Sequence, residues 1–423
     1  MPTTPQPAAG TRTSTLIILA LAAVVRLLAA FLVLTRYPKG WLFTRGIEMT
    51  LLARNVLAGH GLSSPFGPPT GPTAFIAPGY PLFVAAVFKI FGIETTASAF
   101  VIMLLHVAAN IVTIALIMRL ARRLFHQQAA LIAGVLWAFS PPLILLPTIF
   151  WDTSFAICLL TWLVWFVLEF AGDTGRVVSR RNWIFLGVYC ALTALLTPAL
   201  LFVLVLVFSW LLWQQRKHSL TAPLFAVLAF AVVFSPWPLR NDRVFHAFIP
   251  LRTTVGFELW MGNHDGANGY LMESLFPMYN SSELAQYNQM GEVAYTEQKS
   301  ALAKQYIATY PKLFAEMTLR RALRFWTGTG TQNGSPFFAL HATLTSVLGL
   351  IGLWMAYRRG HPALAALFAL VFLFFPVPYY ITHAEFRYRL IIDPLLTVFA
   401  SGVITLLLAE PTQPQKPSTP QGL

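Results

Sequence analysis

Charged side chains are scarce in this chain. Asp, Glu, Lys and Arg together make up 11% of its 423 residues, whereas apolar types make up 57%; a soluble domain carries about 25% charged residues. So few polar side chains cannot cover a soluble globule of this length. The composition therefore excludes an ordinary soluble domain and predicts an all-α polytopic membrane protein, because helices satisfy their own backbone hydrogen bonds in lipid.

Acidic residues and cysteines are scarcer still. Sixteen acids stand against 29 basic residues, a net charge of +13, yet the basic residues lie mainly between apolar segments and form no single patch, so no nucleic-acid partner is expected. Cys158 and Cys190 lie inside apolar runs and are interpreted as small core residues rather than a disulfide. The sequence has no internal repeat, Gly-rich phosphate loop, hydrolase elbow or zinc-binding helix.

About ten apolar segments are expected to be transmembrane helices. The segment at 80–92 is short for a span of about twenty residues and is expected to lie along the interface. Arg26 lies near the middle of the first span, where a charge is costly, so it should face the bundle and contact a structural partner. The predicted spans are 16–34, 97–118, 129–146, 153–170, 183–196, 200–213, 223–237, 339–357, 362–376 and 391–409.

These spans place one transmembrane domain at residues 15–409. Residues 1–14 are rich in Pro and Thr and are expected to be a disordered cytoplasmic tail, and residues 410–423 form a second cytoplasmic tail. Two external loops stand out within the domain, one at 36–81 and a longer one at 239–337.

Basic clusters between the spans predict the orientation. They follow the second, fourth, sixth and eighth spans and fall on the same side as Arg12, which the positive-inside rule makes cytoplasmic. The clusters are Arg119, Arg122 and Arg123; Arg176, Arg180 and Arg181; Arg216 and Lys217; and Arg358 and Arg359. Glu48, Asp152 and both long loops then face the outside of the plasma membrane.

The first external loop carries a candidate catalytic carboxylate. Met49, Leu52 and Val56 recur at helical spacing, which predicts a short amphipathic helix that ends near the glycines around His60. Glu48 stands at its front. A carboxylate on a helix that lies against a membrane is a candidate catalytic group. The alternative is that Glu48 is only a first-turn acid, which the helix dipole favours.

The long external loop has helical patterns. Asn280 is a predicted N-cap with Glu283 three residues on. A basic amphipathic helix begins at Pro311 and is expected to lie in the membrane interface. His264 and Asp265 suit a turn better than a metal site.

The stretch before the last span gathers polar side chains. His383, Glu385, Arg387 and Arg389 follow the interface aromatics Tyr379 and Tyr380. Arginine binds phosphate oxygens through its planar fork, so these cations suit an anionic lipid headgroup. The alternative is an aromatic belt with an ion pair at the end of a span.

Three segments resemble the GT-C superfamily of lipid-linked-sugar glycosyltransferases, and more narrowly its bacterial family 39-like branch, which includes protein mannosyltransferases and aminoarabinose transferases. The segments are RGIEMTLLARNVLAGHGLSSPFGPPTGPTAFIAPGYPLFVAAVFKIFG, PWPLRNDRVFHAFIPLRTTVGFELWMGN and EFRYRLIIDPLL. The resemblance implies a glycosyltransferase that moves a sugar from a polyprenyl-phosphate donor to a lipid, glycan or protein acceptor among membrane lipids.

The resemblance also implies site roles. Glu48 matches the position of the catalytic base, and Asp152 matches a second acidic position of relatives. Many members have Asp where this chain has Glu48, and some have lysine where it has Ala77, so other cations must hold the donor phosphate. The substrate-binding candidates are Arg54, His60, Tyr80, Arg240, Tyr380, His383, Arg387 and Arg389, with Lys89 as a further source of charge. No cofactor is expected; a divalent metal could assist the phosphate, but no ligand set is visible.

Two other functions are compatible with the sequence. A transporter or flippase of a lipid-linked glycan would line its pathway with similar charges, although transporters commonly have internal repeats and interrupted helices at mid-membrane. A membrane scaffold with a degenerate site would explain Glu48 and Ala77.

The orientation predicts a labelling pattern. In a background lacking Cys158 and Cys190, single cysteines at Ser63 and Ala285 should react with an impermeant thiol reagent in intact cells, whereas a cysteine at Gly360 should not. A cysteine at Gly175 should not react either. The reverse pattern would remove the shared external face.

Overall fold

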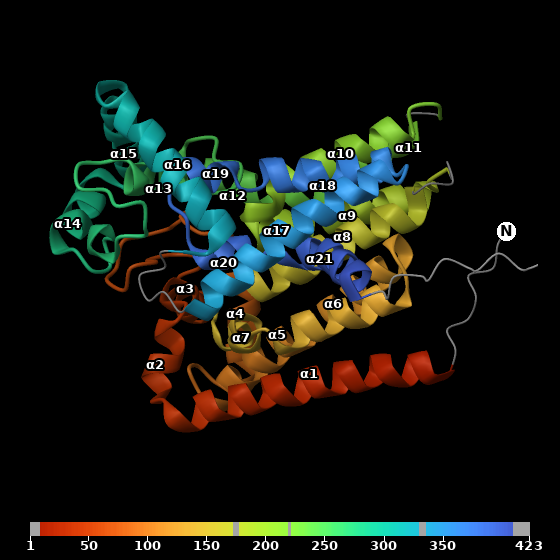
Figure 1. Ribbon diagram of the computed structural model, residues 1–423. Helices are drawn as coiled ribbons and strands as arrows, with labels where there is room; N and C mark the ends of the chain where they lie inside the picture. Colours follow the sequence, from red (N-terminus) through yellow and green to blue (C-terminus); the bar gives the residue numbers. More distant parts are fainter. Residues whose placement is uncertain (1–8, 172–176, 219–220, 330–335, 409–423) are drawn as a thin grey trace, which may run out of the picture.

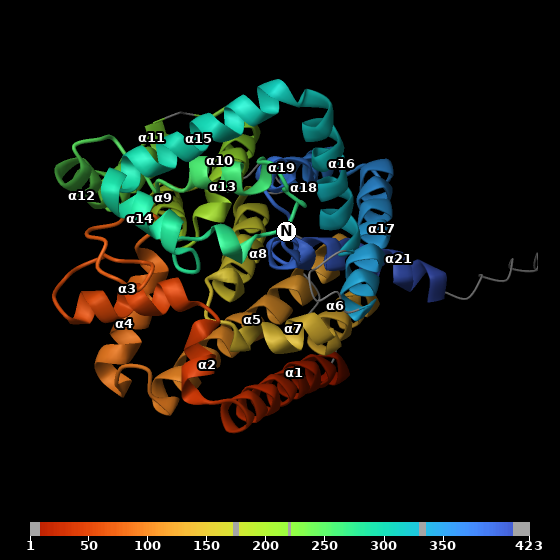
Figure 2. The ribbon, with the colours of Figure 1, turned by 90° about the vertical axis from the view of Figure 1, so that its left-hand side faces the viewer.

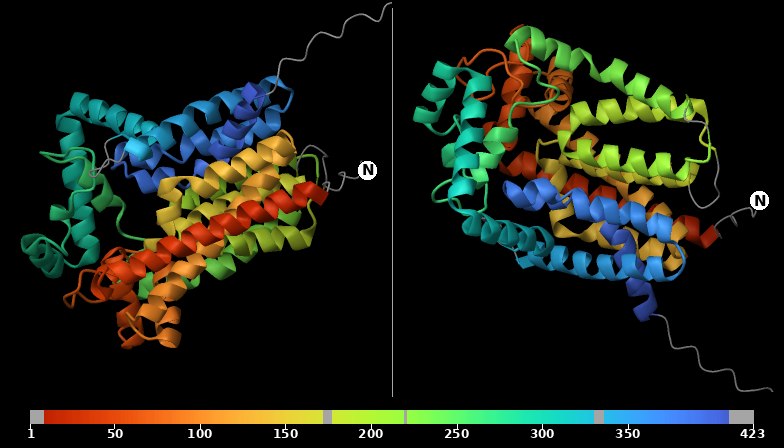
Figure 3. Two further views of the ribbon diagram at one scale, coloured as in Figure 1. Left: turned by 60° about the horizontal axis from the view of Figure 1, so that its bottom comes forward. Right: turned by 90° about the horizontal axis from the view of Figure 1, so that it is seen from above.

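The structure, a computed structural model, describes residues 9–171, 177–218, 221–329 and 336–408. Within these ranges the chain is helical, with a single isolated bridge between Ser63 and Pro72. Long apolar helices lie side by side, and shorter helices cover one end of this bundle (Figure 1). The start of α1 (Ala9–Arg36) lies at the other end, as the views from below and above also show (Figure 3).

The helix bundle is built from the apolar segments that the sequence predicts. Its helices are α1 (Ala9–Arg36), α4 (Gly79–Phe91), α5 (Thr96–Leu124), α6 (Gln127–Phe139), α7 (Pro141–Leu145), α8 (Thr153–Ala171), α9 (Arg180–Leu196), α10 (Leu201–Gln214), α11 (Thr221–Phe234), α17 (Pro336–Arg358), α18 (Pro362–Phe374) and α21 (Asp393–Leu408). Each predicted span coincides with one of these helices or with a bent pair. The prediction of an all-α polytopic membrane protein is confirmed.

Few of these helices are long enough to cross a bilayer without a break. Among the described residues, four segments meet that condition: Arg12–Arg36, Thr96–Leu124, Pro336–Arg358 and Pro362–Ile381. Two bent pairs raise the number to six, one bent by 61° between α6 and α7 and one by 42° after α11. Proline at each break removes a backbone donor and ends the straight helix. The remaining apolar helices are shorter, including α4 with 13 residues.

A lobe of short helices covers one end of the bundle (Figure 2). Its helices come from both predicted loops and from the stretch before the last span. They are α2 (Lys39–Thr44), α3 (Ile47–Leu57), α12 (Pro236–Phe245), α13 (Val255–Gly262), α14 (Ser281–Met290), α15 (Glu292–Thr309), α16 (Pro311–Thr327), α19 (Val377–Ile381) and α20 (Phe386–Arg389). The Asn280 side chain caps α14 by accepting hydrogen bonds from the amides of Ser282 and Glu283, as predicted. On α16, Leu319 and Leu323 are exposed, whereas Arg321 is fully buried.

Helix α21 forms the centre of the bundle and is buried along most of its length. It packs closely against α17, where a Cβ at Gly352 would lie 2.4 Å from the carbonyl oxygen of Phe399. Small residues allow such close contact between helices in membranes.

Arg26 caps a neighbouring helix from inside the bundle. Its fully buried guanidinium donates to the carbonyl oxygens of Trp137 (3.0 Å) and Ala138 (2.9 Å). These carbonyls belong to the last turn of α6, where the break before α7 leaves them without helical partners and where positive charge is favourable. The predicted structural partner of Arg26 is therefore the end of a broken helix.

A buried ion pair joins α20, α21 and α17. Arg389 and Asp393 are both fully buried and contact each other directly. Arg389 also donates to the carbonyl oxygen of Ala342 (2.9 Å) and the hydroxyl of Ser346 (2.8 Å). The other oxygen of Asp393 lies 3.0 Å from Nε2 of His341. The pair thus fixes the turn of α20 against α17.

Breaking this pair should destabilise the protein strongly. The Asp393→Asn variant leaves the guanidinium of Arg389 buried without a counter-charge, a loss of about 3–5 kcal/mol in the free energy of unfolding. The double variant Arg389→Met/Asp393→Leu should recover most of that loss, because no charge stays buried. Thermal unfolding in detergent checks both; equal stability of Asp393→Asn and wild type would contradict the role of the pair.

Candidate active site

A cavity of about 520 Å³ lies where the lobe of short helices meets the bundle. Residues far apart in sequence line it, including four of the predicted site residues: Glu48, Tyr80, Asp152 and His383. A fifth, Arg387, also lines the cavity, together with Ala77. Much of the wall is apolar: Phe75, Ile76, Leu196, Ala199, Leu201, Phe202, Leu251, Phe276 and Ile391.

Glu48 reaches the cavity from the first turn of α3. Gly46, the N-cap of this helix, has a φ of +140°, and a Cβ there would lie 2.2 Å from the carbonyl oxygen of Phe150. The amide of Phe150 in turn donates to the carbonyl oxygen of Arg45 (2.9 Å). Only glycine permits this backbone contact, which ties the start of α3 to the segment that carries Asp152.

Burial raises the pKa of Glu48 above its usual value, and the nearby positive charge of Arg387 opposes the rise. A raised pKa makes the carboxylate a stronger proton acceptor at neutral pH.

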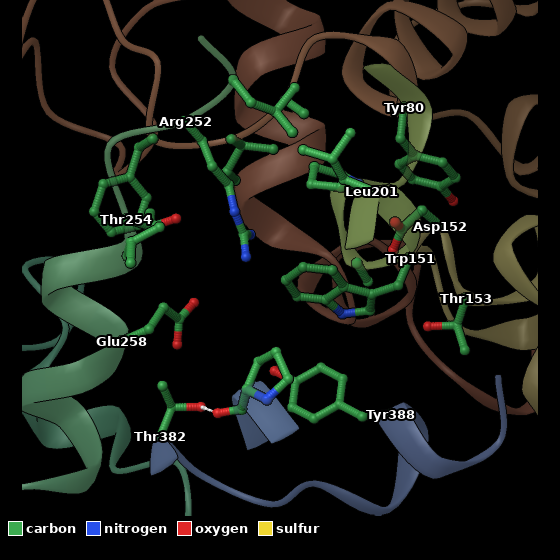
Figure 4. Close-up of a pocket in the computed structure, with 18 of the residues that line it drawn as sticks. Tyr80, Trp151, Asp152, Thr153, Leu201, Arg252, Thr254, Glu258, Thr382 and Tyr388 are labelled. Atoms are coloured by element: carbon green, nitrogen blue, oxygen red, sulfur yellow. Dashed lines mark hydrogen bonds between the residues drawn. The ribbon is translucent and has the colours of Figure 1, made fainter. Parts of the chain in front are cut away.

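Asp152 lies just before α8, with Tyr80 beside it (Figure 4). Burial raises the pKa of Asp152 too, while the charges of Arg387 and Arg252 lower it. The Tyr80 hydroxyl lies 3.1 Å from Nε2 of His106, whose Nδ1 lies 3.1 Å from the carbonyl oxygen of Pro147. A carbonyl oxygen can only accept a hydrogen bond, so Nδ1 of the neutral imidazole carries the proton. Nε2 therefore accepts a hydrogen bond from the Tyr80 hydroxyl.

Arg387 is held by aromatic rings. Its guanidinium lies over the Trp151 ring, 4.1 Å from the centroid, and donates to the Tyr388 hydroxyl (3.1 Å). That hydroxyl lies 3.1 Å from Nε2 of His383. Burial raises the pKa of Tyr388 to about 12, so the hydroxyl stays protonated. These contacts leave Arg387 charged and fixed in orientation.

Arg252 is the cation that the sequence interpretation missed. It lines the cavity, and its guanidinium extends toward the centre (Figure 4). It makes no hydrogen bond or ion pair with another residue in the described part of the chain. A single arginine within the apolar stretch FIPLRTTVGF was the available signal.

A buried carboxylate holds the loops at 36–81 and 239–337 together beside the cavity. Glu292 accepts hydrogen bonds from the amide of Ala74 (2.8 Å) and from the hydroxyls of Thr73, Thr253 and Tyr287. Thr253 is adjacent to Arg252, so this carboxylate fixes that arginine relative to the first loop.

The other predicted binding residues lie outside the cavity lining. Arg54 is at the surface, 3.5 Å from Glu94, and His60 and Lys89 are exposed. The remaining three make structural contacts. Arg240 donates to the carbonyl oxygens of Thr73 and Leu62, Tyr380 accepts from the Trp326 ring, and Arg389 pairs with Asp393.

In the described ranges, no group of three His, Cys, Asp or Glu residues is arranged to hold a metal. His264 lies in a turn, with Nδ1 2.6 Å from the carbonyl oxygen of Asp265.

Comparison with known proteins agrees with this architecture. Residues 75–239 match the family model described as dolichyl-phosphate-mannose-protein mannosyltransferase. No curated protein sequence matches the chain.

Several solved structures align with most of this chain. The archaeal oligosaccharyltransferase AglB from Archaeoglobus fulgidus, in complex with an inhibitory peptide and a dolichol-phosphate, aligns with a TM-score of 0.55 at 15% identity, over 93% of this chain and 50% of its own. An Archaeoglobus fulgidus oligosaccharyltransferase tethered to an acceptor peptide gives 0.54 at 13% identity, over 93% and 49%. ArnT from Cupriavidus metallidurans, bound to undecaprenyl phosphate, gives 0.39 at 15% identity, over 92% and 77%.

The family model matched over residues 75–239 and the fold shared with the oligosaccharyltransferases both agree with the resemblance that the sequence indicates. Both matches are to glycosyltransferases, the class of enzyme that the sequence predicts. This chain spans about half the length of the oligosaccharyltransferases it matches.

The electrostatics of the cavity predict a pH effect. Because the charge of Arg387 lowers the pKa of Glu48, the Arg387→Gln variant should move the titration of Glu48 to higher pH. The carboxyl band in infrared difference spectra, assigned through Glu48→Gln, measures this shift. Arg54→Gln, which removes a surface guanidinium, is the control and should leave the midpoint unchanged. A midpoint in Arg387→Gln equal to or below that of wild type would exclude the coupling.

Proposed function

We propose that this protein transfers a sugar from a polyprenyl-phosphate donor to an acceptor hydroxyl at the external face of the plasma membrane. The observation that supports this most directly is the cavity itself: two carboxylates with raised pKa and two arginines share one space between apolar walls. A lipid-phosphate sugar has the matching parts, namely an apolar chain, an anionic phosphate and a polar ring.

Glu48 is the proposed general base. It removes the proton of the acceptor hydroxyl while that oxygen bonds to the anomeric carbon and the bond to the phosphate oxygen breaks. Base catalysis of this kind contributes about a hundred- to ten-thousandfold. Asp152, which shares the cavity and is tied to the start of α3 through Phe150, is proposed to orient the acceptor.

Arg252 and Arg387 are the proposed phosphate ligands. The leaving phosphate gains negative charge as the sugar departs, and fixed cations stabilise that charge most when they need no reorganisation. Arg387 meets this condition because Trp151 and Tyr388 hold it. Arg252 has its guanidinium available, so it replaces the lysine that some relatives have at the position of Ala77.

The external orientation rests on the basic clusters of the sequence. The lobe of short helices lies at the end of the bundle opposite the start of α1 (Figure 1). Arg12, at the start of α1, lies on the side that the positive-inside rule makes cytoplasmic.

The Glu48→Gln variant tests the base. It keeps the size and polarity of the side chain but cannot accept a proton, so transfer should fall by about a hundredfold or more while donor binding stays normal. Mass spectrometry of membranes supplied with labelled dolichyl phosphate mannose follows release of the lipid phosphate. Glu297→Gln, on the exposed surface of α15, is the matched control.

Near-wild-type transfer by Glu48→Gln would remove the base assignment. If the wild type releases no lipid phosphate but moves the labelled lipid between leaflets of a vesicle, the protein is a transporter and the proposed function is wrong.

A further inference from the structure

One wall of the cavity has buried polar atoms that make no hydrogen bond. The hydroxyl of Thr254, Oε2 of Glu258 and Nδ1 of His383 are buried and make no hydrogen bond with the described residues. Thr254 and His383 are each only 2% exposed. Buried polar groups are nearly always hydrogen-bonded in proteins, and each unpaired group costs stability. Three such atoms beside one cavity indicate a ligand that completes their hydrogen bonds.

These residues form a continuous polar face. Thr254 and Glu258 are one helical turn apart at the start of α13, where the amide of Glu258 donates to the carbonyl oxygen of Thr254 (2.8 Å). His383 lies opposite, with Nδ1 3.4 Å from Oε2 of Glu258. The Glu258 side chain extends into the cavity, with Thr254 and Thr382 on either side of it (Figure 4).

Neighbouring hydrogen bonds define which groups donate on this face. Arg387 donates to the Tyr388 hydroxyl, which donates to Nε2 of His383, because an oxygen that accepts from arginine has its own proton to give. In the neutral imidazole the proton is then on Nδ1, which lies 3.4 Å from Oε2 of Glu258 without forming a hydrogen bond to it. The face thus presents one nitrogen donor, one carboxylate acceptor and one hydroxyl that does both.

We propose that Thr254, Glu258 and His383 form the subsite for the sugar ring of the donor. Ring hydroxyls both donate and accept, so they match this mixed set, whereas a hydrocarbon or a second phosphate would not. The position fits the donor rather than the acceptor. Arg252 lies two residues before Thr254, at most about 7 Å along the chain, so a phosphate on Arg252 brings its attached ring to this wall.

This subsite rests on the proposed function, but a binding comparison tests it separately. Two lipids are used, dolichyl phosphate and dolichyl phosphate mannose, and native mass spectrometry of the full chain in detergent measures the Kd of each. The sugar preference is the ratio of the two constants. Wild type should prefer the mannosyl lipid by about tenfold, the effect of one well-placed polar contact worth about 1.4 kcal/mol.

Substitutions of Glu258 and Thr254 should lower the preference for the mannosyl lipid, whereas substitution of Arg252 should weaken the binding of both lipids. Glu258→Gln should bring the ratio close to one and leave the Kd of dolichyl phosphate unchanged. Arg252→Ala should weaken binding of both lipids and keep the ratio. Thr254→Val should also lower the ratio, with a melting temperature equal to or above that of wild type, because it removes an unpaired buried hydroxyl. Glu297→Gln is the control.

The outcomes separate the two proposals. A wild-type ratio of one, or a preference that survives in both Glu258→Gln and Thr254→Val, would overturn the sugar subsite while leaving Glu48 and phosphate binding untouched. Loss of transfer in Glu48→Gln together with an unchanged sugar preference would support both. Absence of binding to either lipid would overturn the proposed function and the subsite together.

Discussion

The buried pair of Arg389 and Asp393 is the interaction on which the active-site geometry depends. It joins the central helix α21 to α17 and fixes the short turn of α20 between them. Arg387 lies two residues before the buried arginine on that same turn, so its place in the cavity follows from the pair. In lipid an unpaired charge is costly, and that cost keeps the turn in one position. A structural ion pair thus orients a neighbouring cation that lines the cavity.

Arg387 and Arg389 therefore face different parts of the structure, although they lie only two residues apart. Residues two apart on a helical turn point about 200° away from each other, so Arg387 faces the cavity while Arg389 faces α17. From the sequence alone, both arginines are equally good candidates for binding phosphate. The choice between them is made by the partners in α17, which lie more than forty residues away along the chain.

The predictable part of this protein is the part governed by composition and order. Apolar length and arginine position predicted the helices and the external loops, and topology then placed Glu48, Asp152 and His383 on one side. Arg252 and Glu258 escaped notice because single charges in an apolar loop have no spacing to mark them. Arg240 was chosen for its charge, yet the carbonyl groups of the first loop occupy its guanidinium; only tertiary packing shows that.

The backbone contact at Gly46 has a consequence for how the site can change. It joins the start of α3 to the segment before α8, so Glu48 and Asp152 are held at fixed positions relative to each other. A change in one of these segments therefore also affects the other. Segment 252–258 belongs to a different loop, which Glu292 joins to the first loop through Thr73 and Thr253. Under the proposed function, the two acids and most of the sugar subsite are then carried by separate pieces of backbone. Exchange of this segment offers a route to a new donor with Glu48 and Asp152 left in place.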